Sequence, residues 1–136
     1  MIEHFSRNER EFMQLAEMFQ EDRDLLWLCA DGRDVWPNER TKPTPERFQR
    51  YTALFESTGV KFGLSRRFLA DGQIWFRYWA VRGMGNLEKG YAIVPSPPKP
   101  LVDSLDEPQQ PTAYRHLSGN WYLYYHDGDS ILGPCI

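Results

Sequence analysis

Cysteine is scarce in this sequence, and its two copies lie far apart. Cys29 sits in a short apolar run and Cys135 is next to the last residue, with no C-x-x-C pair. Two cysteines at this distance do not form the disulfide framework of a small secreted domain, and they lack the ligand spacing of a zinc site. We therefore expect free thiols at both positions and no bound metal.

Long apolar runs and an excess of basic residues are also missing. No stretch approaches the roughly 18–20 apolar residues of a membrane-spanning helix, and the first ten residues contain no apolar core of a secretory signal. The formal net charge is −3, whereas nucleic-acid binders carry a basic face. We therefore expect a cytoplasmic protein with neither a membrane span nor a nucleic-acid partner.

Recognisable catalytic motifs are absent as well. The sequence has no G-x-S-x-G elbow, no H-E-x-x-H, no P-loop and no dinucleotide fingerprint. We therefore expect no cofactor, and the sequence does not favour an enzyme. The remaining catalytic hypothesis is a hydrolase that pairs His116 or His126 with Asp103 or Asp106, which would require a hydrogen bond between the two side chains.

Aromatic residues, in contrast, are abundant: five Trp, seven Tyr and eight Phe in a chain of 136 residues. Each such side chain can bury about 150–250 Å², so these rings can supply the core of one domain. The chain length is typical of a single domain. We predict one domain over residues 1–136.

The first half of the chain shows helical periodicity. Ser6 and Glu9 match a capping box, and the apolar residues after them recur at helical spacing, which predicts a helix near 7–21. The apolar run at 25–30 fits either a buried strand or the last turn of a helical hairpin.

A second helix is predicted near 44–58 from its end signals. Thr44 is a suitable N-cap residue, and Pro45 takes the first helical position, where its missing N–H costs nothing. Gly59 is a natural terminator because glycine readily adopts the left-handed conformation that ends many helices. After this residue the period of the sequence changes from helical to two.

Period-two segments predict five strands. They lie near residues 60–69, 73–82, 88–94, 113–117 and 121–126. Helices followed by a run of strands indicate an α+β fold. We predict a two-layer sandwich in which a four- to five-stranded antiparallel sheet, ordered as along the chain, carries both helices on one face. The proline-rich connection 95–113 should partly cover the other face.

The last predicted hairpin carries the main candidate surface. With a three-residue loop at 118–120, strand alternation places five polar-tipped rings on one face: Tyr114, His116, Tyr122, Tyr124 and His126. A two-residue loop would shift one arm by a residue and send His116 to the opposite face. We interpret this face as a binding surface, because tyrosine combines a large contact area with a small entropy cost. An ordinary structural role for these rings is the alternative.

The same hairpin does not predict a metal site. In this register His116 and His126 lie about four residues apart along the strands, or roughly 13 Å, whereas zinc ligands must share one centre about 2 Å away. A second candidate surface comes from Trp75, Arg77 and Trp79, which alternation places on one face. An arginine stacked on tryptophan can bind a carboxylate or phosphate, or it can simply mark the solvent face.

Three segments of the C-terminal part carry a resemblance. They are Lys89–Pro95, Pro97–Asp106 and Tyr114–Tyr125. Together they resemble the pattern KGY…P…P…SLD…YRH…GNWYLYY of a family of small, uncharacterised bacterial proteins. The resemblance covers roughly the C-terminal third of the chain. It implies a bacterial source and brings no activity or ligand with it.

The sequence therefore favours a non-enzymatic bacterial interaction protein that binds a protein partner, or a second copy of itself, through its aromatic sheet face. An immunity or antitoxin-type inhibitor is the most concrete version, because Tyr, Trp and Arg dominate interface hot spots. The alternative is a small-ligand-binding domain with a pocket between the sheet and the proline-rich connection, where His116, Tyr114 and Arg77 would supply the polar groups.

Overall fold

The computed structural model describes residues 1–31, 35–36, 42–66, 72–81, 87–105 and 111–128. The helices are α1 (Ile2–Arg7), α2 (Glu9–Glu21) and α3 (Pro45–Thr58). The strands are β1 (Trp27–Leu28), β2 (Val35–Trp36), β3 (Gly63–Ser65), β4 (Ile74–Val81), β5 (Leu87–Ile93), β6 (Thr112–Ser118) and β7 (Trp121–Asp127). An antiparallel sheet with helices confirms the predicted α+β class.

The described strands form one sheet in the order β2-β1-β3-β4-β5-β7-β6, antiparallel at every step. The prediction of four to five strands in chain order is wrong on two counts. The apolar run near residue 27 adds β1, which pairs with β2 and β3, and β7 rather than β6 lies beside β5. The central position of β7 buries both of its faces, which suits its run of large rings. The two-layer arrangement stays a prediction.

The N-terminal helix is divided, where the sequence predicted one helix over 7–21. Asn8 leaves the helical conformation at φ −119° and ψ 20°, and its side-chain amide donates to the His4 carbonyl at 2.9 Å. Ser6 lies inside α1 and does not cap α2. The extra helix places Phe5 against the sheet, 5.1 Å from the Trp121 ring, so tertiary packing overrides the local capping signal.

Helix α3 follows its sequence signals closely. The Thr44 hydroxyl accepts from the Arg47 amide at 3.2 Å, Pro45 occupies the first turn, and Gly59 ends the helix at φ +72°. The guanidinium of Arg47 then donates to Asp22 at 2.9 and 3.1 Å, and the Tyr51 hydroxyl donates to the same carboxylate at 2.5 Å. These bonds tie α3 to the end of α2.

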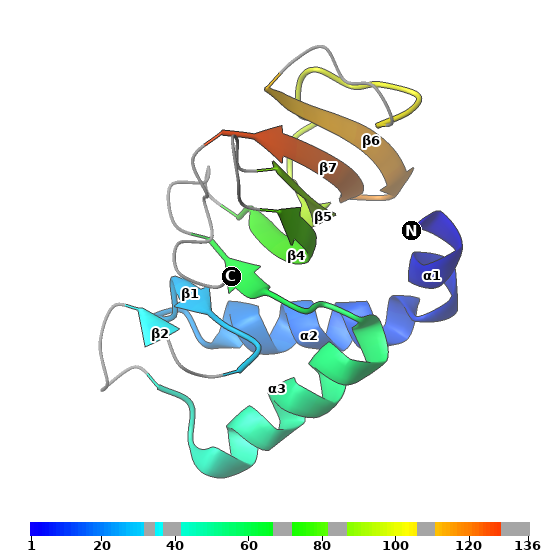
Figure 1. Ribbon diagram of the computed structural model, residues 1–136. Helices are drawn as coiled ribbons and strands as arrows, with labels where there is room; N and C mark the ends of the chain where they lie inside the picture. The colour runs from blue at the N-terminus through cyan, green and yellow to red at the C-terminus, as the bar shows by residue number, and fades with distance from the viewer. Residues whose placement is uncertain (32–34, 37–41, 67–71, 82–86, 106–110, 129–136) are drawn as a thin grey trace.

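The main core lies between the helices and one face of the sheet, and Figure 1 shows all three helices on that side. Phe12 of α2 is fully buried at its centre, 4.6 Å from the Tyr91 ring and 6.0 Å from Trp121. A second buried cluster lies on the opposite face of the sheet. It consists of Trp75, Ala92, Val94, Tyr114, Tyr122 and Tyr124.

The first part of the proline-rich connection runs along β6 and covers its open edge. The Tyr114 amide donates to the Pro100 carbonyl at 3.0 Å, and the Val102 amide donates to the Tyr114 carbonyl at 2.8 Å. Leu101 forms a parallel bridge with Tyr114. A strand edge left bare would invite pairing with another chain, so this segment protects β6 as well as packing on it.

Cys29 is buried and disulfide-bonded, so the expected free thiol at this position is wrong, while Cys135 lies outside the described residues. Among the helices in the described ranges, none combines the length and the apolar character that crossing a membrane requires.

Candidate functional site

The structure confirms the shared face of the predicted hairpin rings but not their exposure to solvent. Tyr114 pairs with Tyr124 and His116 with Tyr122. The predicted three-residue loop at 118–120 is wrong: a bulge before the turn pairs Ser118 with Trp121, so only residues 119–120 form the loop. Tyr114, Tyr122 and Tyr124 are 8%, 5% and 0% exposed. The expectation of a wet aromatic face is therefore wrong for these three rings.

The predicted surface of Trp75, Arg77 and Trp79 is divided by a β-bulge. Arg77 pairs with Gly90, but the next partner of β5 is Lys89, which pairs with Trp79. The extra residue at Tyr78 turns the strand over, as a bulge does. Trp75 and Arg77 remain on the face away from the helices, where both are buried. Trp79 lies on the helix-side face with 43% of its surface exposed.

Arg77 forms a buried ion pair with Glu88. Its Nε donates to Glu88 Oε2 at 2.6 Å, and the two side chains are 0% and 4% exposed. The Tyr124 hydroxyl lies 3.5 Å from the same oxygen. The other carboxylate oxygen, Oε1, is buried without a hydrogen-bond partner among the described residues, as is Trp75 Nε1. A buried polar atom without a partner is costly. Because one oxygen of Glu88 already lacks a partner, loss of the bond between Arg77 and the other oxygen would add to this cost.

Gly90 makes room for this ion pair. It lies between Arg77 on β4 and Tyr124 on β7, on the same face as Glu88 because residues two apart on a strand share a face. A Cβ at this position would lie 2.1 Å from the Phe76 carbonyl oxygen and 2.8 Å from the Tyr124 ring. Because Gly90 has no side chain, the Arg77 guanidinium and the Tyr124 phenol can both approach Glu88.

The hairpin histidines each contact an oxygen that does not belong to a carboxylate. The His116 ring nitrogen lies 2.9 Å from the Gly119 carbonyl oxygen, and the His126 ring nitrogen lies 2.8 Å from the Thr112 hydroxyl. Asp103 is exposed, and Asp106 lies outside the described residues. Within the described ranges, no three His, Cys, Asp or Glu side chains gather as metal ligands would.

Burial of the tyrosines predicts an alkaline transition. Desolvation is the main cause that raises the pKa of four buried hydroxyls: Tyr51, Tyr91, Tyr114 and Tyr124. In the unfolded chain tyrosine ionises near pH 10. Because the folded pKa values are the higher ones, the stability that these groups contribute is complete below about pH 10 and is lost as the pH rises further.

Absorbance at 295 nm, which reports tyrosinate, should therefore show fewer ionised tyrosines in the folded protein than in urea at the same pH near 10.5. The missing tyrosines should ionise together with unfolding at higher pH, as followed by circular dichroism. Identical titration curves in the folded and unfolded states would contradict the burial described above.

An exposed apolar strip lies on the helix-side face of the sheet. Trp79 and Val81 of β4 are 43% and 44% exposed. Trp79 pairs with Lys89, which pairs with Tyr125, and Val81 pairs with Leu87. Residues paired across strands lie side by side on one face. We call exposed Trp79 and Val81, with their half-buried neighbours Leu87 and Tyr125, the Trp79 strip; Lys89 lies in its middle.

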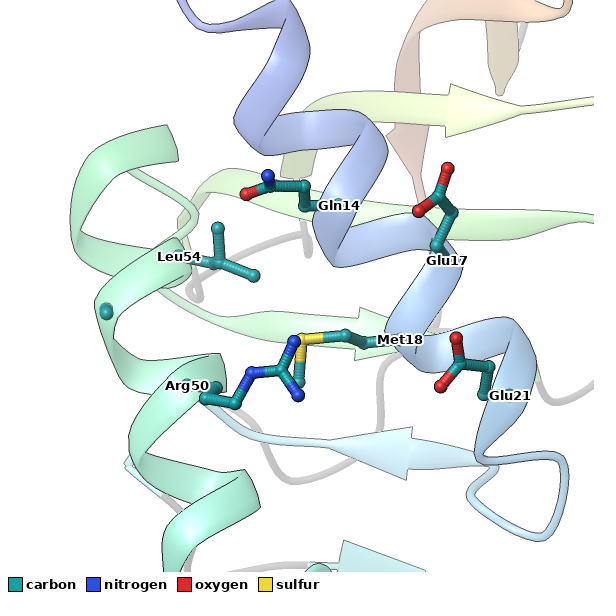
Figure 2. Close-up of a pocket in the computed structure, with 7 residues that line it drawn as sticks. Gln14, Glu17, Met18, Glu21, Arg50 and Leu54 are labelled. Atoms are coloured by element: carbon teal, nitrogen blue, oxygen red, sulfur yellow. The ribbon is translucent and has the colours of Figure 1, made fainter.

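A pocket of about 410 Å³ lies between α2 and α3. Figure 2 shows Met18 of α2 and Arg50 of α3 pointing toward one another there, whereas Glu17 and Glu21 lie on the outer side of α2. The charged side chains of this lining are exposed to solvent. They do not converge on a buried centre, so we assign no chemistry to this pocket.

The sequence analysis missed the strip because of the bulge in β4. Strict alternation from Arg77 puts Trp79 on the arginine face, and only the bulge reverses this. Glu88 gave no clear signal of its own, because Lys89 follows it in the same strand. A buried carboxylate requires a charged partner, but the sequence does not show that Glu88 is the buried one of the two charges. Comparison of the chain with protein-family models, curated proteins and solved structures found no match.

Proposed function

We propose that this protein is a non-enzymatic interaction protein that binds a protein partner through the Trp79 strip. The observation that carries the proposal is the exposure of Trp79 and Val81 on a sheet face whose continuation is buried under α1 and α2. Contiguous exposed apolar residues on a rigid sheet mark interaction sites. An immunity or antitoxin-type inhibitor remains the most concrete form of this function.

The chemistry of the strip supports a protein partner. Tryptophan and tyrosine are enriched among residues that dominate binding energy, and Trp79 and Tyr125 flank Lys89 on neighbouring strands. The strip lies on hydrogen-bonded strands of the sheet, so little conformational entropy is lost when a partner covers it. The buried rings Tyr122 and Tyr124 cannot serve this role unless the second cluster opens.

Truncation of Trp79 tests the proposal. The Trp79→Ala variant should lose partner capture from a bacterial lysate, with affinity for a purified partner reduced tenfold or more, because central hot-spot residues each contribute about 2 kcal/mol or more. The thermal midpoint should change little, since Trp79 is partly exposed. Immobilised protein, mass spectrometry and titration calorimetry provide the measurements.

Met13→Ala is the matched control, because Met13 is 47% exposed and lies on α2. This variant should capture the same proteins as the wild type. Light scattering would detect a homodimer, and a dimer that Trp79→Ala dissociates would identify a second copy as the partner. Equal capture by wild type and Trp79→Ala, with both proteins monomeric, would refute the proposal.

A further inference from the structure

A second pocket, of about 470 Å³, lies between the sheet, α1 and the proline-rich connection. Its lining includes Lys89 of β5, Arg115 of β6 and Leu123 of β7, with Leu105 from the connection and Ile2 from α1. The sequence predicted a pocket between the sheet and this connection, but with His116, Tyr114 and Arg77 as its polar groups. The structure places other side chains there, on the helix-side face of the sheet.

The floor of this pocket is apolar. Leu123 and Leu105 are buried at 5% and 6% exposure, whereas Ile2 is exposed at the rim. Sites for small molecules are mostly apolar, hold a few placed polar groups, and measure about 300–1,000 Å³. The pocket agrees with that description in size and in the nature of its floor.

Two cationic side chains, Lys89 and Arg115, line the pocket beside this apolar floor. Arg115 pairs with Leu123, and Lys89 pairs with Tyr125 two residues further along the same strand. Two strand spacings of about 4.8 Å and a two-residue offset of about 6.8 Å separate their Cα atoms by roughly 12 Å. Both side chains lie on the same face as Leu123, so they can approach one bound group from opposite sides.

Neither cation has a carboxylate partner in the part of the chain that the structure describes. Lys89 and Arg115 are both half-buried, which makes an uncompensated charge more costly than on an open surface. Glu3 also lines the pocket, but its side chain is 89% exposed and its carboxylate lies 3.9 Å from Arg7. A bound anion would therefore compensate a charge that the described residues leave without a partner.

We propose that this pocket binds a small organic carboxylate with a compact apolar body. Arg115 would hold the carboxylate through its planar pair of donors, and Lys89 would add a second positive charge. The apolar body would lie on Leu123 and Leu105. The inference goes beyond partner binding at the Trp79 strip and does not depend on it.

Titration of the ¹⁵N-labelled full chain with 4-methylpentanoate, followed by NMR, tests the pocket. Saturable shifts should appear at the amides of Lys89, Arg115 and Leu123 and be absent from α3. The neutral analogue 4-methylpentanamide should bind at least tenfold more weakly, because it lacks the charge. Inorganic phosphate should also bind more weakly than the acid, because it cannot cover the apolar floor.

Arg115→Gln and Lys89→Gln should each weaken binding of the acid about tenfold or more, because a hydrogen bond to a charged group is lost. The matched control is Lys61→Gln, which removes the same charge from an exposed position and should bind like the wild type. Three results would each overturn the proposal: no saturable shifts, equal binding of acid and amide, or wild-type affinity in Arg115→Gln. The NMR spectrum of each variant reports directly whether it is folded.

Discussion

Replacement of Glu88 by alanine should lower the free energy of unfolding by about 3–5 kcal/mol, the range for breaking a buried ion pair by removing one partner. The Arg77 guanidinium is fully buried, and its Nε donates to Glu88 at 2.6 Å. Without the carboxylate, a cation stays in the protein interior without that acceptor. Urea unfolding followed by tryptophan fluorescence gives the free energy by linear extrapolation.

A double variant separates the charge from the packing. In Arg77→Met/Glu88→Leu both charges are replaced by apolar groups, and such replacements are often neutral or stabilising. The double variant should therefore be more stable than Glu88→Ala. If the double variant lost as much free energy of unfolding as Arg77→Met and Glu88→Leu lose together, the two side chains would act independently.

Local features of the fold could be predicted from the sequence where a local cause decides them. Helix α3 has its N-cap, its proline and its terminal glycine in the expected places. The ends of strands β4 to β7 lie within one residue of their predicted ranges, because alternation over seven or eight residues is a strong signal. The pairing of His116 with Tyr122 also agrees with the predicted register.

Features that depend on distant contacts could not be predicted in this way. The position of β7 beside β5 depends on how the chain between β5 and β6 crosses the sheet. The bulge at Tyr78 has no marker in its own sequence, although it decides which face Trp79 occupies. Burial of the hairpin tyrosines depends on their contacts with Trp75, whose ring lies 4.1 Å from Tyr124. Alternation predicts a shared face but does not say what covers it.

The same distinction explains why the candidate site in the structure differs from the one that the sequence predicted. The sequence favoured the densest group of rings, yet dense aromatic groups bury the most apolar area and so belong in a core first. Exposed binding residues are instead those that the core leaves uncovered, as at Trp79, or that lack a charge partner, as at Arg115. Both properties depend on tertiary contacts, which a local sequence pattern does not determine.

Phe12→Ala should destabilise the protein by about 3–5 kcal/mol, the usual cost of removing a fully buried phenylalanine. Phe12 joins α1, α2 and the sheet, since its ring lies 5.3 Å from Phe5, 4.6 Å from Tyr91 and 6.3 Å from Phe76. The cavity would therefore open where these elements meet. They cannot all close over it at once, so the cost should fall at the upper end of this range.

The neighbouring variant Met13→Ala provides the control. Met13 is exposed on the other side of α2, so its truncation should change the free energy of unfolding by no more than about 0.5 kcal/mol. Both variants replace one residue by alanine in the same helix, so helix propensity contributes little to the difference. A loss below about 1 kcal/mol for Phe12→Ala would contradict the placement of α2 against the sheet, on which the position of the Arg115 pocket also depends.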